Sequence, residues 1–469
     1  MRLLQGVGTV AAAIAVLVAP SAARAAEVPA GAPEGAVPSA QPSLVAGVRA
    51  GDGPLMACAG LAQACTIDTP RGRAYEVRVT PVEAGPTHVL EVAVTWRAPG
   101  ARRLAPRRTI VSSLVPEAVG RRLVLPAIVR ASGTWCLAPR LLDAAGAVVA
   151  TAAPSCVRHR PAIELGWAGD IVVGSHYGLP PNGGRDQFDA VDHLLRAPDL
   201  MIGNYEGTLS RGGSPRCGGG GLCYLFQAPP ERARNLAAAG FDVMSLANNH
   251  ALDYGAEARR QTVRALARVG VRSAGLPGQV TTMQVEDTTV AIVGISPYPG
   301  TTNMRSRSAV QALVAQARRR ADIVVVCMHV GLEGEAGAHV PRGLDYGTDT
   351  RGGARAAIDA GADVVFGSGP HVVRGVERYR GRYVVYSSGN FAGWRNFGLG
   401  RLTSQSGVVR MTFDHRGRPQ AAAWDGVVLR DPGTPHPDRT GAVVRRVASL
   451  SRADFGRAGA RFTASGAFR

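Results

Sequence analysis

The chain has 469 residues, of which 46% are hydrophobic and 5% are aromatic. This length exceeds that of one ordinary domain, so we expect more than one domain and a substantial buried core. The formal net charge is +18, and all 53 basic residues are arginine. A GC-rich coding sequence would explain the arginine excess, and the functional alternative is a surface that attracts an anionic polymer or phosphate groups. The sequence contains no zinc finger, RNA-binding signature or helix with clustered basic residues, so nucleic acid is not an expected partner.

The N-terminal segment is typical of a secretory signal peptide covering residues 1–25. Arg2 precedes an apolar run over residues 7–19, and a small-residue pattern ends at Ala25, the expected cleavage site. The apolar run is short for a membrane span, and no cysteine near the cleavage site would accept a lipid. We therefore expect an exported protein that is secreted or held at the cell surface by partners. Residues 26–48 are rich in alanine, proline and glycine, which predicts a disordered linker.

Export determines how the seven cysteines are interpreted. Six of them form three local pairs, and Cys327 stands alone in an apolar predicted strand. We predict three disulfides and one buried free thiol, although spacing alone leaves the connectivity open. A metal-binding role for the last pair is the alternative, but the glycines between its members favour a loop closed by a disulfide. The pairs are Cys58 with Cys65, Cys136 with Cys156, and Cys217 with Cys223.

Residues 49–160 are predicted to form a β-rich domain. Alternating apolar and polar residues indicate strands near residues 75–80, 89–96 and 121–129. Residues 134–156 read as a hairpin that turns at residues 144–146 and is closed by a disulfide. A small β-sandwich is the expected fold. No residue in this region points to catalysis, so we expect it to serve in binding, spacing or domain packing.

Residues 161–430 show strands alternating with helices, the pattern of an α/β domain. Residues 431–469 are left as a C-terminal tail. The predicted strands cover residues 163–167, 200–203, 243–246, 290–295, 323–328, 364–366 and 383–387, and the predicted helices cover residues 188–195, 231–239, 256–269, 309–320 and 353–360.

Polar side chains that bind metals stand at the ends of five of these strands. Each has an ordinary explanation by itself: Asp170 suits a helix cap, Glu206 a solvated surface, and His329 a core histidine. Their coincidence at strand ends favours one shared site, because ligands of α/β folds collect there. Oxygen and nitrogen ligands in this number suit one or two divalent ions of manganese, iron or zinc. The predicted metal ligands are Asp170, Glu206, Asn249, His329 and His371, and the predicted catalytic residues are His250 and Asp253.

An ordered series of motifs over residues 163–415 resembles the CapA family, whose members are associated with poly-γ-glutamate or capsule synthesis. This resemblance implies a calcineurin-like metallophosphoesterase fold, with two mixed sheets flanked by helices. The motifs are GWAGD (166–170), IGNYEGTL (202–209), FDVMSLANNHALDYG (241–255), VVCMHVGLEG (325–334), DAGADVVFGSGPHVVRGVE (359–377) and YSSGNF (386–391).

The resemblance also implies roles for the strand-end residues. Asp170 would be the first metal ligand, and Glu206 would stand where phosphoesterases usually place a bridging aspartate. Asn249 would bind metal, while His250 would face the leaving group or the reacting oxygens. His329 and His371 would complete the site.

Two departures from the family pattern predict that one of the two metals binds weakly. Val172 replaces the histidine of the usual Asp-x-His start, and Ser368 with Gly369 stands where many relatives have a second histidine. His176 and His339 lie in predicted loops and are the candidates to compensate, although exposed loop histidines are more often bystanders.

Two functions remain open at this stage. The first is an exported, metal-dependent hydrolase of envelope polymer metabolism that acts on a phosphorylated substrate, with metals that activate water for attack on a phosphoryl or acyl centre. The second is a catalytically degenerate scaffold that binds an anionic polymer or organises a membrane-bound polymer synthase. The arginine excess and the departures from the ligand pattern favour the scaffold. A serine hydrolase is the weaker enzyme alternative, because the sequence has no GxSxG motif.

Overall fold

The architecture described below is that of a computed structural model. The predicted signal peptide lies outside the described part of the chain. Cys58 does too, so the predicted pair of Cys58 and Cys65 falls outside the description. The structure describes residues 44–47, 65–69, 73–79, 88–98, 105–114, 122–129, 133–151, 154–175, 178–217 and 223–469.

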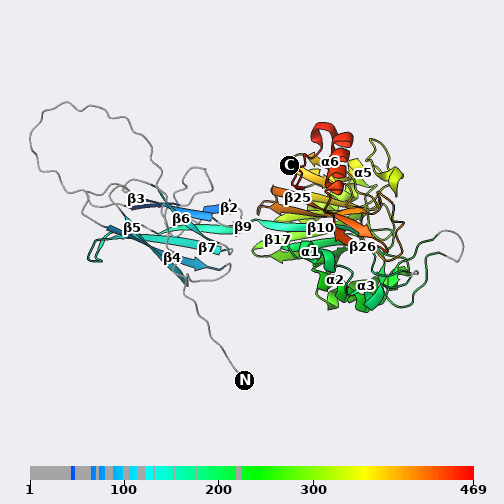
Figure 1. The fold of residues 1–469 in the computed structure, drawn as a ribbon, viewed down its shortest axis with the longest axis horizontal. Helices are drawn as coiled ribbons and strands as arrows, with labels where there is room; N and C mark the ends of the chain where they lie inside the picture. The colour runs from blue at the N-terminus through cyan, green and yellow to red at the C-terminus, as the bar shows by residue number, and fades with distance from the viewer. Residues whose placement is uncertain are drawn as a thin grey trace, which may run out of the picture. The chain divides into compact units, whose positions relative to one another are not determined.

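The N-terminal part of the described chain is built from strands alone. One sheet has the order β1-β3-β6, and the other has the order β2-β9-β7-β4-β5 with β8 paired to β7 (Figure 1). β1 falls inside the segment predicted as a linker, where it pairs with β3. The strands are β1 (Leu44–Gly47), β2 (Cys65–Thr69), β3 (Arg73–Val79), β4 (His88–Arg97), β5 (Ala105–Leu114), β6 (Arg122–Val129), β7 (Gly133–Leu142), β8 (Val148–Thr151) and β9 (Ser155–Pro161).

The predicted hairpin of this region is confirmed. β7 and β8 are antiparallel neighbours joined across a turn at residues 143–147. Cys136 and Cys156 are register partners on β7 and β9, and a disulfide joins them.

The first sheet of the α/β part has the order β15-β14-β11-β10-β24-β25-β26, with β23 also paired to β10. The strands β10, β11, β14, β15 and β23 run parallel, whereas β24, β25 and β26 add antiparallel pairs. The strands are β10 (Ile163–Ile171), β11 (Leu200–Tyr205), β14 (Val243–Ser245), β15 (Arg272–Ala274), β23 (Asn390–Ala392), β24 (Gln405–Phe413), β25 (Pro419–Arg430) and β26 (Thr434–Pro437).

The second sheet has the order β16-β17-β19-β20-β22-β21, with β18 also paired to β17. Its central strands are parallel, and apart from polar residues at their ends they are apolar and buried on both faces, as expected for buried parallel strands. A short parallel pair, β12 (Thr208–Leu209) and β13 (Gln227–Ala228), lies apart from both sheets. The strands are β16 (Thr281–Val285), β17 (Thr288–Ser296), β18 (Thr302–Asn303), β19 (Ile323–His329), β20 (Val364–Ser368), β21 (Val376–Tyr379) and β22 (Arg382–Val385).

The two sheets pack face to face around one core. Trp167 of β10 stacks on Phe366 of β20 with ring centroids 5.6 Å apart, and its indole donates to the Gly367 carbonyl oxygen at 3.3 Å. Both rings are fully buried, so this contact joins the inner faces of the sandwich.

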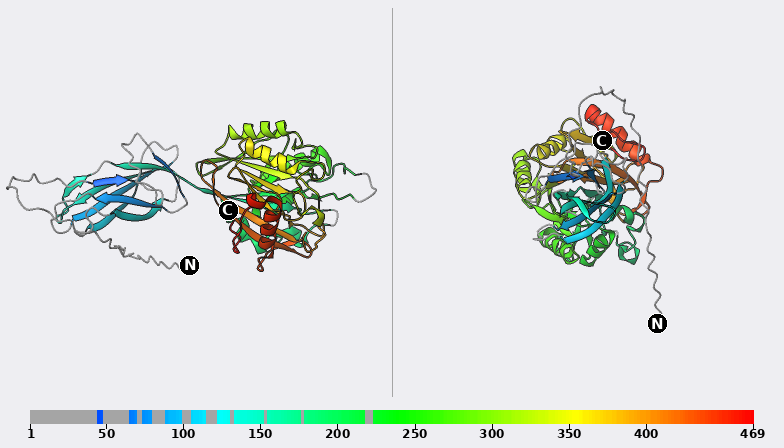
Figure 2. Two further views of the ribbon diagram at one scale, coloured as in Figure 1. Left: turned by 90° about the horizontal axis from the view of Figure 1, so that it is seen from above. Right: turned by 90° about the vertical axis from the view of Figure 1, so that its left-hand side faces the viewer.

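Helices cover the outer faces of the sandwich (Figures 1 and 2). The core cluster outside the first sheet includes residues of α1, α2 and α3, and that outside the second sheet includes residues of α4 and α5. The predicted architecture of two mixed sheets flanked by helices is therefore confirmed. The helices are α1 (Asp192–Leu195), α2 (Ala233–Ala239), α3 (Gly255–Arg268), α4 (Arg307–Arg318), α5 (Thr350–Asp359) and α6 (Ala442–Phe455).

The segment 431–469, separated from the domain in the sequence analysis, takes part in the fold. β26 pairs with β25, and α6 places Val443, Val447 and Leu450 in the core between the sheets. Within the described residues, no helix has the length and apolarity needed to cross a membrane.

Candidate metal centre

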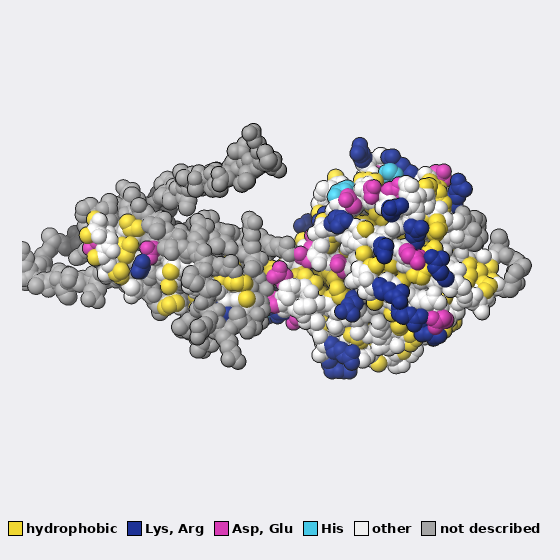
Figure 3. All heavy atoms as spheres, turned by 90° about the horizontal axis from the view of Figure 1, so that it is seen from below, with side chains coloured by type: hydrophobic (Ala, Val, Ile, Leu, Met, Phe, Trp, Pro, Cys, Tyr) yellow, Lys and Arg dark blue, Asp and Glu magenta, His cyan; other side chains and the backbone are white. Residues whose placement is uncertain are grey.

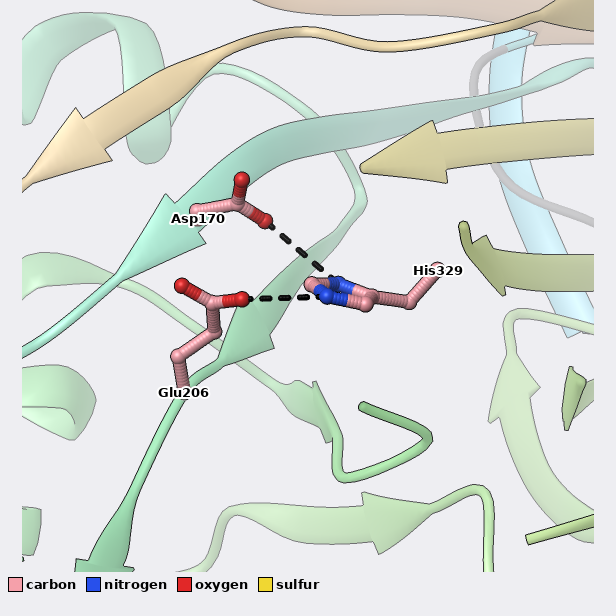
Figure 4. A group of neighbouring side chains, drawn as sticks. All are labelled: Asp170, Glu206 and His329. Atoms are coloured by element: carbon pink, nitrogen blue, oxygen red, sulfur yellow. Dashed lines mark ion pairs between the residues drawn. The ribbon is translucent and has the colours of Figure 1, made fainter. Parts of the chain in front are cut away.

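Three predicted metal ligands converge at the carboxyl ends of the parallel strands. Asp170 belongs to β10, Glu206 follows β11, and His329 is the last residue of β19. One ligand atom from each lies within 4.8 Å of the others, and all three side chains are fully buried (Figure 4). Because β10 and β11 belong to the first sheet and β19 to the second, both sheets supply the centre.

The strand register explains why these side chains meet. Asp170 is the register partner of Asn204 on one side and of Asn390 on the other. A bulge between Ala168 and Asp170 shifts the register at Gly169. A Cβ atom at Gly169 would lie 2.0 Å from the Gly389 carbonyl oxygen, so this close approach of two strands requires glycine.

The distances within the centre are those of interacting groups. His329 Nε2 lies 3.2 Å from Glu206 Oε1, and His329 Nδ1 lies 3.7 Å from Asp170 Oδ1. His371 joins from the loop after β20, with its Nδ1 3.1 Å from Asp170 Oδ2. His371 thus contacts the triad through Asp170.

Several buried oxygens in this region have no hydrogen-bond partner. Both carboxylate oxygens of Glu206 and the Oδ1 atom of Asn249 are in this state. A buried carboxylate without partners is costly, and a bound cation would remove that cost. The donor set of carboxylate, amide and imidazole groups is also the set that manganese, iron and zinc accept. The residues present therefore fit a divalent metal.

The pKa values of the cluster follow from burial and mutual charge. Burial and the charge of Asp170 raise the pKa of Glu206 well above its usual value. Burial acts in the same direction on Asp170, but the hydrogen bond and charge of His371 outweigh it, so the pKa of Asp170 is lowered. Burial lowers the pKa of His329 to about 3, which leaves its imidazole neutral and able to bind metal.

His371 is in an unusual backbone and electrostatic state. Its φ is +58°, in the left-handed region that non-glycine residues rarely adopt. Its Nδ1 lies 2.8 Å from Asn390 Oδ1 in addition to its contact with Asp170. Burial lowers the pKa of His371, but the charges of Glu206 and Asp170 raise it overall to about 10.

Amide and hydroxyl groups hold the ligands in place. The Asn204 amide group donates to Asp170 Oδ1 at 2.9 Å and lies 3.2 Å from His329 Nδ1. Ser368, the register partner of His329, places its Oγ 3.0 Å from the same Nδ1 atom. Ser368 is therefore a neighbour that orients His329. At Gly369, a Cβ atom would lie 2.8 Å from the Val330 nitrogen, so a histidine there requires a shift.

His250 and Asp253 form a pair beside this centre. His250 Nδ1 lies 2.8 Å from Asp253 Oδ2, and both side chains are buried. The Phe226 amide also donates to Asp253 Oδ2, at 2.7 Å, and Arg216 Nε lies 3.0 Å from Asp253 Oδ1. With Nδ1 engaged, Nε2 is the ring nitrogen of His250 that is left for a substrate.

A cavity of about 550 Å³ has His250 and His371 in its wall. The disulfide predicted between Cys217 and Cys223 is formed, and the residues next to it contact the site. Arg216 precedes it and bonds to the Asn249 carbonyl oxygen and Asp253, while Tyr224 follows it and lines the cavity. The other lining residues include Phe226, Glu333, Asn390, Arg395, Phe397 and Thr403.

Several residues of the site were not predicted from the sequence. Asn204 and Asn390 stand at strand ends and touch the ligands, and Tyr298 follows β17 with its ring 5.9 Å from that of His329. The strand-end rule that found the ligands would have found all three. His339 pairs with Asp454 at 2.6 Å and does not belong to the triad, and His176 lies outside the described residues. Cys327 is free and buried, as predicted.

The sandwich and its strand-end cluster define the class, an α/β protein with a candidate metal centre. The sequence model described as "Bacterial capsule synthesis protein PGA_cap" matches residues 164–393. Over this region the chain is similar to the CapA family of capsule synthesis proteins.

Two relatives from bacilli are named for this role. The chain is 27% identical over 254 residues to "PGA biosynthesis protein CapA" of Bacillus subtilis (strain 168), which covers 50% of this chain but only 64% of that relative. It is 27% identical over 306 residues to "Capsule biosynthesis protein CapA" of Bacillus anthracis, covering 60% of this chain and 70% of that one. Among solved structures, purple acid phosphatase PPD1 from yellow lupin seeds aligns with a TM-score of 0.31 and 10% identity, over 76% of this chain and 71% of that chain.

Proposed function

We propose that the chain is an exported, metal-dependent phosphoester hydrolase of envelope polymer metabolism, such as that of capsule or poly-γ-glutamate. One or two divalent ions of manganese, iron or zinc would be held by Asp170, Glu206, Asn249, His329 and His371. The observation that carries the proposal is the buried Glu206 in the cluster with Asp170 and His329. Neither of its carboxylate oxygens has a hydrogen bond, although Oε1 lies 3.2 Å from His329 Nε2. The exact substrate would be a phosphorylated molecule of that metabolism.

The protein groups have separate tasks in this proposal. Such metals polarise a phosphoryl oxygen and lower the pKa of water when bound. Asn204 and Ser368 fix the direction of the His329 ring through its Nδ1. Asp253 accepts the proton of His250 Nδ1, so His250 Nε2 can take or give a proton at the leaving group. His250 is thus the proposed catalytic residue, and Asp253 positions it.

Export is supported by the cysteine chemistry. The disulfides Cys136 to Cys156 and Cys217 to Cys223 suit an oxidising compartment, in agreement with the predicted signal peptide. The expected location is therefore secreted or at the cell surface, with an anionic polymer or a membrane-bound polymer synthase as a partner.

The scaffold function is the second candidate, and the charge of the chain favours it. The net charge of +18 comes from arginine alone, and basic side chains are spread over the face of the α/β part seen in Figure 3. Such a surface would attract an anionic polymer whether or not the centre hydrolyses anything.

Hydrolysis of bis(p-nitrophenyl) phosphate tests the choice. The purified chain is assayed with manganese, iron or zinc beside its Glu206→Gln and His250→Ala variants. If the chain is the proposed enzyme, the wild type should hydrolyse this substrate, and the rate should fall at least about 100-fold in both variants. If the wild type binds metal but does not hydrolyse the substrate, the result would support the scaffold function instead.

A further inference from the structure

The exposed large apolar side chains of the described residues are unevenly distributed. Tyr224 lines the cavity of the metal centre, and Leu332, Leu344 and Tyr346 belong to segments that are connected to its wall. The fifth, Val148, belongs to the β-rich part. Single exposed apolar residues are ordinary, but a group of them marks a binding surface. The exposed fractions are 47% for Tyr224, 41% for Leu332, 71% for Leu344, 66% for Tyr346 and 49% for Val148.

The segments that carry the four side chains are connected to the wall of the cavity. Tyr224 lines it directly, and Leu332 immediately precedes Glu333, which also lines it. The Leu332 amide donates to Asp345 Oδ1 at 2.9 Å. That bond ties Leu332 to the segment in which Leu344 and Tyr346 flank Asp345.

Tyr298 connects Tyr346 with the metal cluster. Its ring is 5.9 Å from the His329 ring. The Arg305 guanidinium donates to the Pro297 carbonyl oxygen at 3.1 Å and to the Gly347 carbonyl oxygen at 3.3 Å, so it joins the segment of Tyr298 to that of Tyr346. The loop that carries Tyr346 is therefore connected, through Arg305 and the segment of Tyr298, to the surroundings of His329.

Hydrogen bonds on both sides hold the loop that carries Leu344 and Tyr346. Arg374 is fully buried and donates to Asp345 Oδ2 at 2.5 Å and to the Gly337 carbonyl oxygen at 2.6 Å. On the other side, Arg305 Nε donates to Thr348 Oγ1 at 3.1 Å. Leu344 and Tyr346 are thus presented to solvent by a fixed loop.

The cavity also contains a cation that suits an anionic group. Arg395 lines it, and no acidic side chain pairs with Arg395 among the residues the structure describes. Its guanidinium lies 5.7 Å from the Trp394 ring centroid. Its backbone has a φ of +55°, and its amide donates to the Pro432 carbonyl oxygen at 2.8 Å. An arginine so placed can form two hydrogen bonds with a phosphate.

We propose that the substrate is an anionic amphiphile, whose phosphate head lies between the metal centre and Arg395 and whose alkyl chain lies on Tyr224, Leu332, Leu344 and Tyr346. This inference rests on the proposed function, because the head group occupies the proposed metal site. It adds that the leaving or retained group is a lipid-like chain.

Binding of two phosphonates to the manganese-loaded full chain tests the inference by calorimetry. Ethylphosphonate supplies the head alone, and decylphosphonate, used below its micelle concentration, adds the chain. Burial of two methylene groups corresponds to about tenfold in affinity, so decylphosphonate should bind at least about tenfold more tightly. Equal affinities would overturn the apolar-chain site alone, whereas failure of both ligands to bind would count against the proposed metal site itself.

Two variants locate the effect. Leu344→Ser combined with Tyr346→Ser should bring the affinity ratio of the two phosphonates close to one, while ethylphosphonate binds as before. Unchanged ethylphosphonate binding also shows that this variant is folded. Val148→Ser, which removes an exposed apolar side chain elsewhere, should keep the full ratio. A ratio that persists in the double variant, or falls equally in Val148→Ser, would contradict the proposal.

Discussion

The Nδ1 atom of His250 lies 2.8 Å from the Oδ2 atom of Asp253, three residues further along the chain. Both side chains are buried beside the metal cluster, and His250 lines the cavity. This pair engages Nδ1, so Nε2 is the nitrogen of His250 that we propose to reach a substrate. It therefore gives the first prediction.

Asp253→Asn should reduce kcat for a phosphodiester by about 10- to 100-fold with little change in KM, because the histidine loses its preferred tautomer. The measurement is steady-state kinetics in the wild-type and His250→Ala backgrounds. If Asp253 acts through His250, Asp253→Asn should cause no further loss of kcat in the His250→Ala background. An equal additional loss there would show that Asp253 has another role.

The buried pair of Arg374 and Asp345 should contribute strongly to stability. Arg374→Leu leaves the Asp345 carboxylate buried without its cation, so the free energy of unfolding should fall by about 3–5 kcal/mol. Chemical denaturation measures the change. Arg307→Leu is the matched control, because Arg307 pairs with Asp349 at the surface and should change stability by less than about 1 kcal/mol. Equal effects of the two substitutions would contradict this assignment.

The cysteines should differ sharply in reactivity in exported protein. Peptide mapping without reduction should recover Cys217 joined to Cys223, and Cys136 joined to Cys156. Cys327 should resist alkylation until the protein unfolds, because it is buried and burial raises the pKa of its thiol. Free thiols at Cys217 and Cys223 in exported material would refute the loop closure.

Metal binding should release protons at neutral pH. In the metal-free protein the pKa of His371 is raised to about 10, and the pKa of Glu206 is raised well above its usual value. Protons that His371 and Glu206 hold at pH 7 must leave when a cation binds. Metal affinity should therefore keep rising above pH 7. Calorimetry in buffers of different ionisation enthalpy counts the protons. Binding without proton release at pH 7 would mean that the group is already deprotonated.

Much of the centre was predictable because β-strand ends are readable from sequence. Asp170, Glu206 and His329 each follow or end an apolar run, and parallel strands bring such ends together. The supporting groups were less visible. Ser368 looks like a missing metal ligand in the sequence, and only the register with His329 reveals its contact with that ring. A histidine at this fully buried position would have to displace its neighbours.

The elements that the sequence analysis missed lack strong local patterns. β25 contains proline, glycine and a run of alanines, all poor strand formers, and it is held by pairing with β24 and β26. α6 carries five arginines or serines among its apolar residues, and its burial against the sheets defines it. Tertiary contacts decide both elements, and these contacts are not local in the sequence.

Metal content tests the account most directly. The wild type, Glu206→Gln and Glu231→Gln are dialysed identically after loading with manganese, iron or zinc, and bound metal is measured by mass spectrometry. Glu231 is exposed and pairs with Arg211, so its substitution is the matched control. We predict at least one tightly held ion per chain in the wild type and in Glu231→Gln, and loss of that ion in Glu206→Gln. A wild type without tightly bound metal, or a Glu206→Gln variant that retains it fully, would contradict a metal centre at Asp170, Glu206 and His329.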